Sequence, residues 1–163
     1  MSSGWIQNVV RQVHAPYATR NQWGYLHEAM EVDGANALEL LFTPCIDQDV
    51  HALFLRQIGQ TDPQALQVII QDQAGFHLPG TDQRVPANVR LLPLPPYSPE
   101  LNPVEKLGDL VKDQICNRLY PNLRKLADRI LAALRPWRTT AASVAALIGT
   151  GWLLDGANTG VPV

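Results

Sequence analysis

The alternation of apolar and polar residues divides the chain into short strands and longer helices. Residues 23–32 have strand-like content, and the next two residues, Asp33-Gly34, form a typical hairpin-turn dipeptide. A second apolar run follows at residues 37–42. These segments therefore predict two strands joined by a tight turn, while residues 1–21 carry little pattern.

Residues 47–59 predict a helix, for which Asp47 or Asp49 is a suitable N-cap. The face predicted to be buried consists of Val50, Leu53, Phe54 and Ile58. The compact apolar run at residues 66–70 is typical of a strand buried on both faces, and a shorter run at residues 89–94 predicts another strand.

The second half of the chain predicts helices after an irregular segment. Prolines exclude regular structure at residues 95–103. Helices are predicted at residues 104–119, 123–134 and 141–148, followed by a loose tail. The stripes expected to be buried in the first two are Val104, Leu107, Val111 and Ile115, and then Leu126, Ile130 and Leu134. The order of elements favours an α/β layered architecture with a mixed sheet.

Composition narrows the class of protein. The chain has 163 residues, 46% hydrophobic and 17% charged, which is typical of a folded globular domain with its own core. No apolar run is long enough to span a membrane and no signal peptide is recognisable, so we expect a cytoplasmic location. The net charge of −2 excludes a strongly basic nucleic-acid-binding module, although a local basic patch remains compatible with it.

Two acidic residues stand where a cation site is expected. Asp72 directly follows the buried apolar strand, at the sheet edge where α/β proteins collect their sites, although a turn or cap also explains it. Glu105 lies three residues after Asn102, and Pro103 suits the first helical position. That arrangement is a capping box, so Glu105 is either a structural residue or a second ligand beside Asp72.

Other polar residues near these acids have simpler interpretations. His77 lies in the loop after Asp72 and is typical of a hydrogen-bonding loop histidine. Tyr97 and Ser98 lie in a rigid proline loop, where a structural role is the simplest. The same proline-rich stretch also fits a polyproline peptide that binds a partner.

Together, the strings IIQDQAGFH and VRLLPLPPYSPELNPVEKL resemble the two signature blocks of DDE transposases of the Tc/mariner superfamily, in its bacterial insertion-sequence branch. The first block runs from Asp72 to His77 and the second from Leu94 to Glu105. The two family acids are separated by 105 − 72 = 33 positions, close to the spacing that the family uses.

The resemblance implies an RNase H-like fold, a five-stranded mixed sheet flanked by helices. It implies Asp72 and Glu105 as catalytic, metal-binding residues in a site of three carboxylates with two Mg²⁺ or Mn²⁺ ions. The supporting loop would comprise His77, Tyr97, Ser98, Pro99, Asn102 and Pro103. The implied reaction is cleavage and strand transfer of DNA, and the partners are the element's terminal repeats and the target DNA.

The chain departs from the family pattern at its start. Trp5 resembles the tryptophan that follows the family's first strand, so the first catalytic Asp would precede Met1. We therefore expect the sheet to lack its first strand, which another transposase chain would supply. Glu28 and Glu31, in the second strand, are the alternative carboxylates. Gly108 replaces the family's Trp, and Gln73 replaces its Asn.

The resemblance leads to a division of the chain and to three hypotheses. Residues 1–135 would form a catalytic core incomplete at its N-terminus, and residues 136–163 a C-terminal helix and tail. The first hypothesis is a transposase core that is inactive alone, because the first Asp is missing. The second is an inactive remnant that is inert, or that binds DNA or full-length transposase as a regulator. The third is an unrelated α/β binding module.

Overall fold

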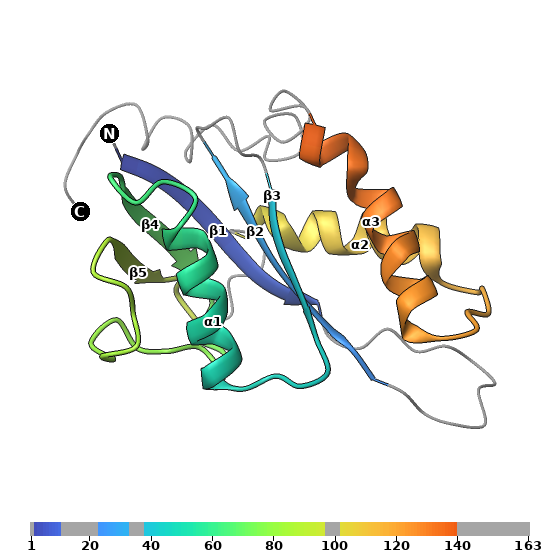
Figure 1. Ribbon diagram of the computed structural model, residues 1–163, viewed down its shortest axis with the longest axis horizontal. Coiled ribbons are helices and arrows are strands. Elements are labelled where there is room, and N and C mark those ends of the chain that lie inside the picture. The colour runs from blue at the N-terminus through green and yellow to red at the C-terminus, as the bar shows by residue number, and fades with distance from the viewer. Residues whose placement is uncertain (1, 11–22, 33–37, 97–101, 140–163) are drawn as a thin grey trace.

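The computed structural model describes residues 2–10, 23–32, 38–96 and 102–139, which form a mixed sheet flanked by helices (Figure 1). The five strands are β1 (Ser2–Val10), β2 (Tyr25–Glu31), β3 (Leu38–Thr43), β4 (Leu66–Gln71) and β5 (Val89–Pro93). The three helices are α1 (Gln48–Gly59), α2 (Pro103–Ile115) and α3 (Leu123–Thr139).

The strand order is β3-β2-β1-β4-β5, so β1 is the central strand. It pairs antiparallel with β2 and parallel with β4, and β4 pairs parallel with β5. The expectation that the sheet lacks its first strand is therefore wrong, and with it the expectation that another chain supplies that strand. Residues 2–10 escaped prediction because polar Gln7 and Asn8 interrupt their apolar run, which leaves neither an alternating nor a continuous pattern.

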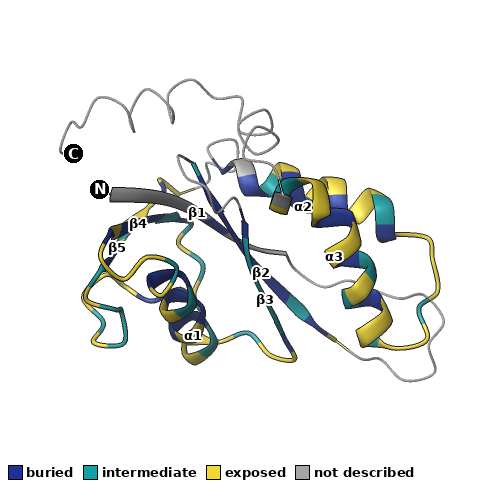
Figure 2. Cartoon of the chain, turned by 45° about the horizontal axis from the view of Figure 1, so that its top comes forward, coloured by how far each residue is buried: buried dark blue, intermediate teal, exposed yellow. Residues whose placement is uncertain are grey.

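Each face of the sheet has its own apolar core, because alternate residues of a strand point to opposite faces. On β2, Ala29 belongs to a cluster with Phe54, Leu55 and Ile58 of α1. Leu26 and Met30 belong to a second cluster, with the buried stripes of α2 and α3. α1 therefore covers one face and the other two helices cover the opposite face, and each helix turns its buried side toward the sheet (Figure 2).

The predicted helices α1, α2 and α3 are all present, but for α1 the predicted buried side is wrong. Asp47 caps α1, with its carboxylate accepting a hydrogen bond from Val50 N at 2.9 Å. The buried stripes predicted for α2 and α3 are confirmed. On α1, however, Leu53 is 46% exposed, and the buried face instead consists of His51, Ala52, Phe54, Leu55, Ile58 and Gly59. The helix is rotated from the prediction because a polar residue, His51, points inward.

Some predictions lie outside the described residues. These are the turn at Asp33-Gly34, the helix at residues 141–148, the loop residues Tyr97, Ser98 and Pro99, and most of the segment 136–163. Within the described part of the chain, α3 continues through Pro136 to Thr139, beyond its predicted end at residue 134. None of the helices described is long and apolar enough to cross a membrane.

Candidate metal centre

Asp72 directly follows β4 and its carboxylate is held from two sides. Its Oδ1 atom accepts a hydrogen bond from Ala74 N at 3.0 Å and lies 2.9 Å from His77 Nδ1. His77 Nδ1 also lies 2.9 Å from the main-chain oxygen of Asp72. The His77 side chain is buried, whereas that of Asp72 is 46% exposed. The carboxylate is therefore fixed in orientation but open to solvent.

Glu105 lies in the first turn of α2, which begins at a capped and anchored residue. Asn102 Oδ1 accepts a hydrogen bond from Val104 N at 3.2 Å, and Asn102 O accepts one from Glu105 N at 3.1 Å. Asn102 Nδ2 donates to the main-chain oxygen of Gln7 at 3.3 Å. The predicted N-cap at Asn102 is confirmed, and its side chain fixes the start of α2 against β1.

β1 lies between these two features. Its register with β4 ends at Ile6 opposite Ile70, and extending that register by two residues would bring Asn8 level with Asp72. Neighbouring strands are about 4.8 Å apart, so the Asp72 backbone lies close to β1 on one side. The start of α2 is bonded to the adjacent position of β1, Gln7. The sequence of β1, SSGWIQNVV, contains no carboxylate.

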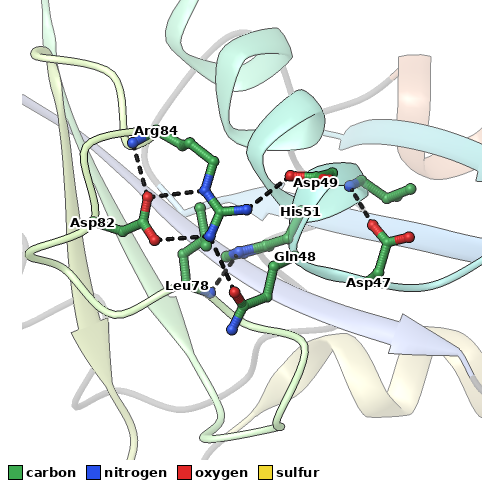
Figure 3. Close-up of polar contacts among 8 residues, drawn as sticks. Asp47, Gln48, Asp49, His51, Leu78, Asp82 and Arg84 are labelled. Atoms are coloured by element: carbon green, nitrogen blue, oxygen red, sulfur yellow. Dashed lines mark hydrogen bonds and ion pairs between the residues drawn. The ribbon is translucent and has the colours of Figure 1, made fainter.

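A buried polar cluster lies on the α1 side of the sheet, near Asp72. Gln7 Oε1 lies 3.1 Å from His51 Nε2. Leu78 N donates to His51 Nδ1 at 2.9 Å (Figure 3). The rings of His51 and His77 have their centroids 4.7 Å apart. Burial is the largest cause that lowers the pKa of His51 to about 3 and that of His27 to about 4. Both imidazoles are therefore neutral at physiological pH.

Arg84, in the loop between β4 and β5, forms hydrogen bonds with the first turn of α1 (Figure 3). Its guanidinium donates to both carboxylate oxygens of Asp82, at 2.9 and 2.8 Å. It also donates to Asp49 Oδ1 at 2.7 Å and to Gln48 Oε1 at 3.0 Å. Bidentate pairing of this kind fixes geometry more than it adds stability at a solvent-exposed position.

Glu28 is fully buried on β2, opposite Asn8 of β1. Neither carboxylate oxygen has a hydrogen-bond partner in the described part of the chain. Burial raises the pKa of Glu28 to about 8, although the positive charge of Lys112 acts to lower that pKa. Among the described residues, no three or more His, Cys, Asp or Glu side chains are grouped so as to hold a metal ion. Glu28 therefore does not complete such a group with Asp72 and Glu105.

The chemistry around Asp72 fits a hydrated divalent cation. Mg²⁺ prefers carboxylate oxygens and retained waters, and Asp72 offers a solvent-accessible carboxylate. Its bonds from His77 and Ala74 are of the kind that orient a metal ligand. Glu105 is partly exposed in the first turn of α2, where the helix dipole stabilises an anion. A joint site of Asp72 and Glu105 stays a prediction.

Two residues of this region, Gln7 and His51, were not predicted from the sequence. Gln7 carried a weak signal, as a polar residue inside an apolar run. The signal for His51 was stronger, because it shares helical spacing with Phe54, Leu55 and Ile58. A histidine at that spacing indicates a polar group inside the core, which requires a partner.

Comparison with known proteins places these features in context. A family model described as "DDE superfamily endonuclease" matches residues 4–127. An uncharacterized protein, y4pE/y4sA of Sinorhizobium fredii (strain NBRC 101917 / NGR234), is 32% identical over 123 residues, which cover 71% of this chain and 90% of that protein.

Solved structures share the fold at low sequence identity. The catalytic domain of Mos1 mariner transposase is 14% identical, with a TM-score of 0.54 over 90% of this chain and 82% of that one. The structure of that domain with Raltegravir and Mn is 16% identical, with a TM-score of 0.56. That match covers 94% of this chain and 82% of the other. A chain of a simian T-cell lymphotropic virus intasome is 14% identical, with a TM-score of 0.55. The match covers 79% of this chain but only 47% of that one. The mixed α/β fold is thus that of RNase H-like integrase and transposase catalytic cores.

Proposed function

Because this chain belongs to the DDE superfamily endonuclease family, we propose that it is the catalytic core of a transposase of the insertion-sequence branch, acting on DNA phosphodiesters at an element's ends. The observation that carries the proposal is that Asp72 and the first turn of α2, with Glu105, flank adjacent positions of the central strand. The segments that carry the two motif acids, β4 and the start of α2, are thereby both bonded to one strand. The cytoplasm remains the predicted location.

In this proposal Asp72 and Glu105 are the ligands of a divalent cation, Mg²⁺ or Mn²⁺. When bound, such an ion activates an attacking hydroxyl and stabilises the leaving oxygen. His77 holds the Asp72 carboxylate in one orientation through its Nδ1 atom. Asn102 fixes the start of α2, and thereby Glu105, against β1. Tyr97, Ser98, Pro99 and Pro103 complete the proposed supporting loop.

The first prediction is that this chain binds Mn²⁺ but does not nick DNA by itself. Two carboxylates are enough to retain a hydrated ion, whereas the family's site uses three, and β1 supplies none. Calorimetric titration with Mn²⁺ should show binding that Asp72→Ala and Glu105→Ala each weaken at least tenfold. Supercoiled DNA carrying the element's ends should remain uncut with Mg²⁺ or Mn²⁺.

The substitution Asn8→Asp tests the reason for the missing activity. The β1–β4 register, extended by two residues, brings position 8 level with Asp72, so a carboxylate there would add the third acid. This variant should bind Mn²⁺ about tenfold more tightly, and the gain should vanish when Glu105→Ala is added. Unchanged Mn²⁺ binding in both single-alanine variants would contradict the proposed site. Robust nicking that both variants abolish would contradict only the predicted inactivity.

A second candidate function is binding of DNA without cleavage, as a regulator of a complete transposase. Residues 103–139 carry eight Lys or Arg against four Asp or Glu, a net charge of +4. The rest of the chain carries five against eleven, a net charge of −6. This asymmetry supports a phosphate-binding surface over α2 and α3. Arg124 and Arg138 are exposed there, and Arg124 lies in a first turn, where the helix dipole does not favour a cation.

A further inference from the structure

Gln7, in the middle of β1, is completely buried and forms hydrogen bonds in two directions. Its side-chain Oε1 lies 3.1 Å from His51 Nε2, on the α1 face of the sheet. Its main-chain oxygen accepts a hydrogen bond from Asn102 Nδ2 at 3.3 Å, at the start of α2. A single residue of the central strand therefore contacts both α1 and the helix that carries Glu105.

His51 is fully buried, and both of its ring nitrogens are engaged. Leu78 N can only donate, so its 2.9 Å hydrogen bond leaves His51 Nδ1 without a proton. The ring proton is therefore on Nε2, which donates to Gln7 Oε1. Because the ring is bonded at both edges, between a strand and a loop, it has one orientation and one tautomer.

His51 is bonded to the same loop that orients Asp72. Leu78 follows His77, and the rings of His77 and His51 are 4.7 Å apart between centroids. Gln71, the residue before Asp72, donates through its Nε2 to the main-chain oxygen of Leu78 at 3.2 Å. A displacement of His51 would therefore move the His77 ring, and with it the donor that fixes the Asp72 carboxylate.

We propose that Gln7 and His51 are positioning residues, which hold Asp72 at a fixed place relative to the first turn of α2. One arm runs from Gln7 through His51 and the Leu78 loop to His77 and Asp72. The other runs from the Gln7 carbonyl to Asn102, and from there to Glu105. The inference rests on the proposed function, because it concerns the relative position of the same two carboxylates.

His27 is a second buried histidine, and it serves as the control for His51. It is also fully buried on the α1 face, with its ring 5.7 Å from that of Phe54. Its Nε2 atom lies 3.2 Å from Thr43 Oγ1, and none of its hydrogen bonds reaches the loop that follows Asp72. His27→Phe is therefore a matched control, which removes a buried imidazole from the same core and leaves the Asp72 loop bonded.

The test uses the full chain and two measurements. The first is the affinity for Mn²⁺ from calorimetric titration, and the second is the metal-free ¹⁵N spectrum of the His77 ring, which reports its tautomer and hydrogen bonding. The variants are His51→Phe, which keeps a ring but no hydrogen bond, and His51→Asn, whose Oδ1 replaces Nδ1 as the acceptor for Leu78. Gln7→Met removes the strand's side-chain acceptor while keeping its size.

We expect His51→Phe and Gln7→Met to weaken Mn²⁺ binding about tenfold and to shift the His77 signals. His51→Asn should weaken Mn²⁺ binding less than His51→Phe and recover part of the His77 shift, since it keeps the hydrogen bond from Leu78 but not the one to Gln7. His27→Phe should change neither. The proposal is overturned if His51→Phe and Gln7→Met leave the His77 signals unchanged. If the unmodified chain binds no Mn²⁺ but the His77 signals still shift, the proposed metal site fails and the positioning role stands.

Discussion

At the scale of single residues, Glu28 shows a conflict between a charged side chain and its surroundings. It lies on β2 between Leu26 and Met30, which both belong to the apolar core under α2 and α3. Its carboxylate oxygens have no partner among the described residues, and burial raises its pKa to about 8. The folded protein therefore keeps Glu28 protonated at neutral pH, at a cost in stability as the pH rises.

This conflict predicts a pH dependence of unfolding. The unfolded chain loses the Glu28 proton near the ordinary value of 4.5, whereas the folded chain keeps it to about pH 8. Glu28 therefore lowers the free energy of unfolding as the pH rises from 4.5 to 8, with a slope of at most about 1.4 kcal/mol per pH unit. The Glu28→Gln variant should lose this slope in urea unfolding.

The difference in slope between Glu28→Gln and the unmodified chain isolates Glu28 between pH 6.5 and 8. Buried His27 and His51 act in the opposite sense below pH 6.5, where the unfolded chain takes up protons that the folded chain refuses down to about pH 4 and 3. The contribution of these two histidines to the pH dependence fades between pH 6.5 and about 7.5, and it is the same in Glu28→Gln and in the unmodified chain. Identical slopes in Glu28→Gln and the unmodified chain between pH 6.5 and 8 would refute this account of Glu28.

At the scale of elements, the start of α2 combines a local signal with a long-range contact. Asn102 caps the helix in the way its sequence predicts, and it also donates to the main-chain oxygen of Gln7, 95 positions away in sequence. α3 begins with a comparable cap, in which Asn122 Oδ1 accepts from Lys125 N at 3.0 Å, but there the bond is exposed. The two caps differ in burial and not in local chemistry.

That difference predicts unequal costs for the same substitution. Asn122→Ala should lower the free energy of unfolding by about 1 kcal/mol, the usual value for a helix cap. Asn102→Ala should cost about 2 kcal/mol or more, because it also leaves the Gln7 carbonyl without its buried donor. Chemical denaturation of both variants measures the difference. Equal costs would mean that the contact between Asn102 and Gln7 contributes nothing to stability.

At the scale of the whole molecule, charge is divided unevenly along the chain. The segment with α2 and α3 carries a net charge of +4, while the remainder, which includes α1, carries −6. The overall net charge of −2 conceals this division. A DNA duplex would be attracted to the α2–α3 face and repelled by the rest, so the charge sets an orientation as well as an affinity.

The orientation is testable through the salt dependence of DNA binding. Replacing exposed Arg124 and Arg138 by Ala should weaken duplex binding and reduce the slope of log K against log[NaCl] by about 1 to 2. Arg56→Ala is the matched control, because Arg56 is exposed on α1, at the opposite face of the sheet. Fluorescence anisotropy over a series of NaCl concentrations gives both slopes. An equal loss in the Arg56 variant would contradict a phosphate-binding face over α2 and α3.

The sequence by itself determined what depends on neighbours along the chain. Helical spacing gave the buried stripes of α2 and α3, side-chain chemistry gave the caps at Asp47 and Asn102, and two motif strings gave the family. Only the tertiary structure made Ser2–Val10 the central strand and turned His51 inward, because both depend on partners that distant segments supply. A buried polar group is stabilised by hydrogen-bond partners, and for Gln7 Oε1 and the His51 ring those partners come from other parts of the fold.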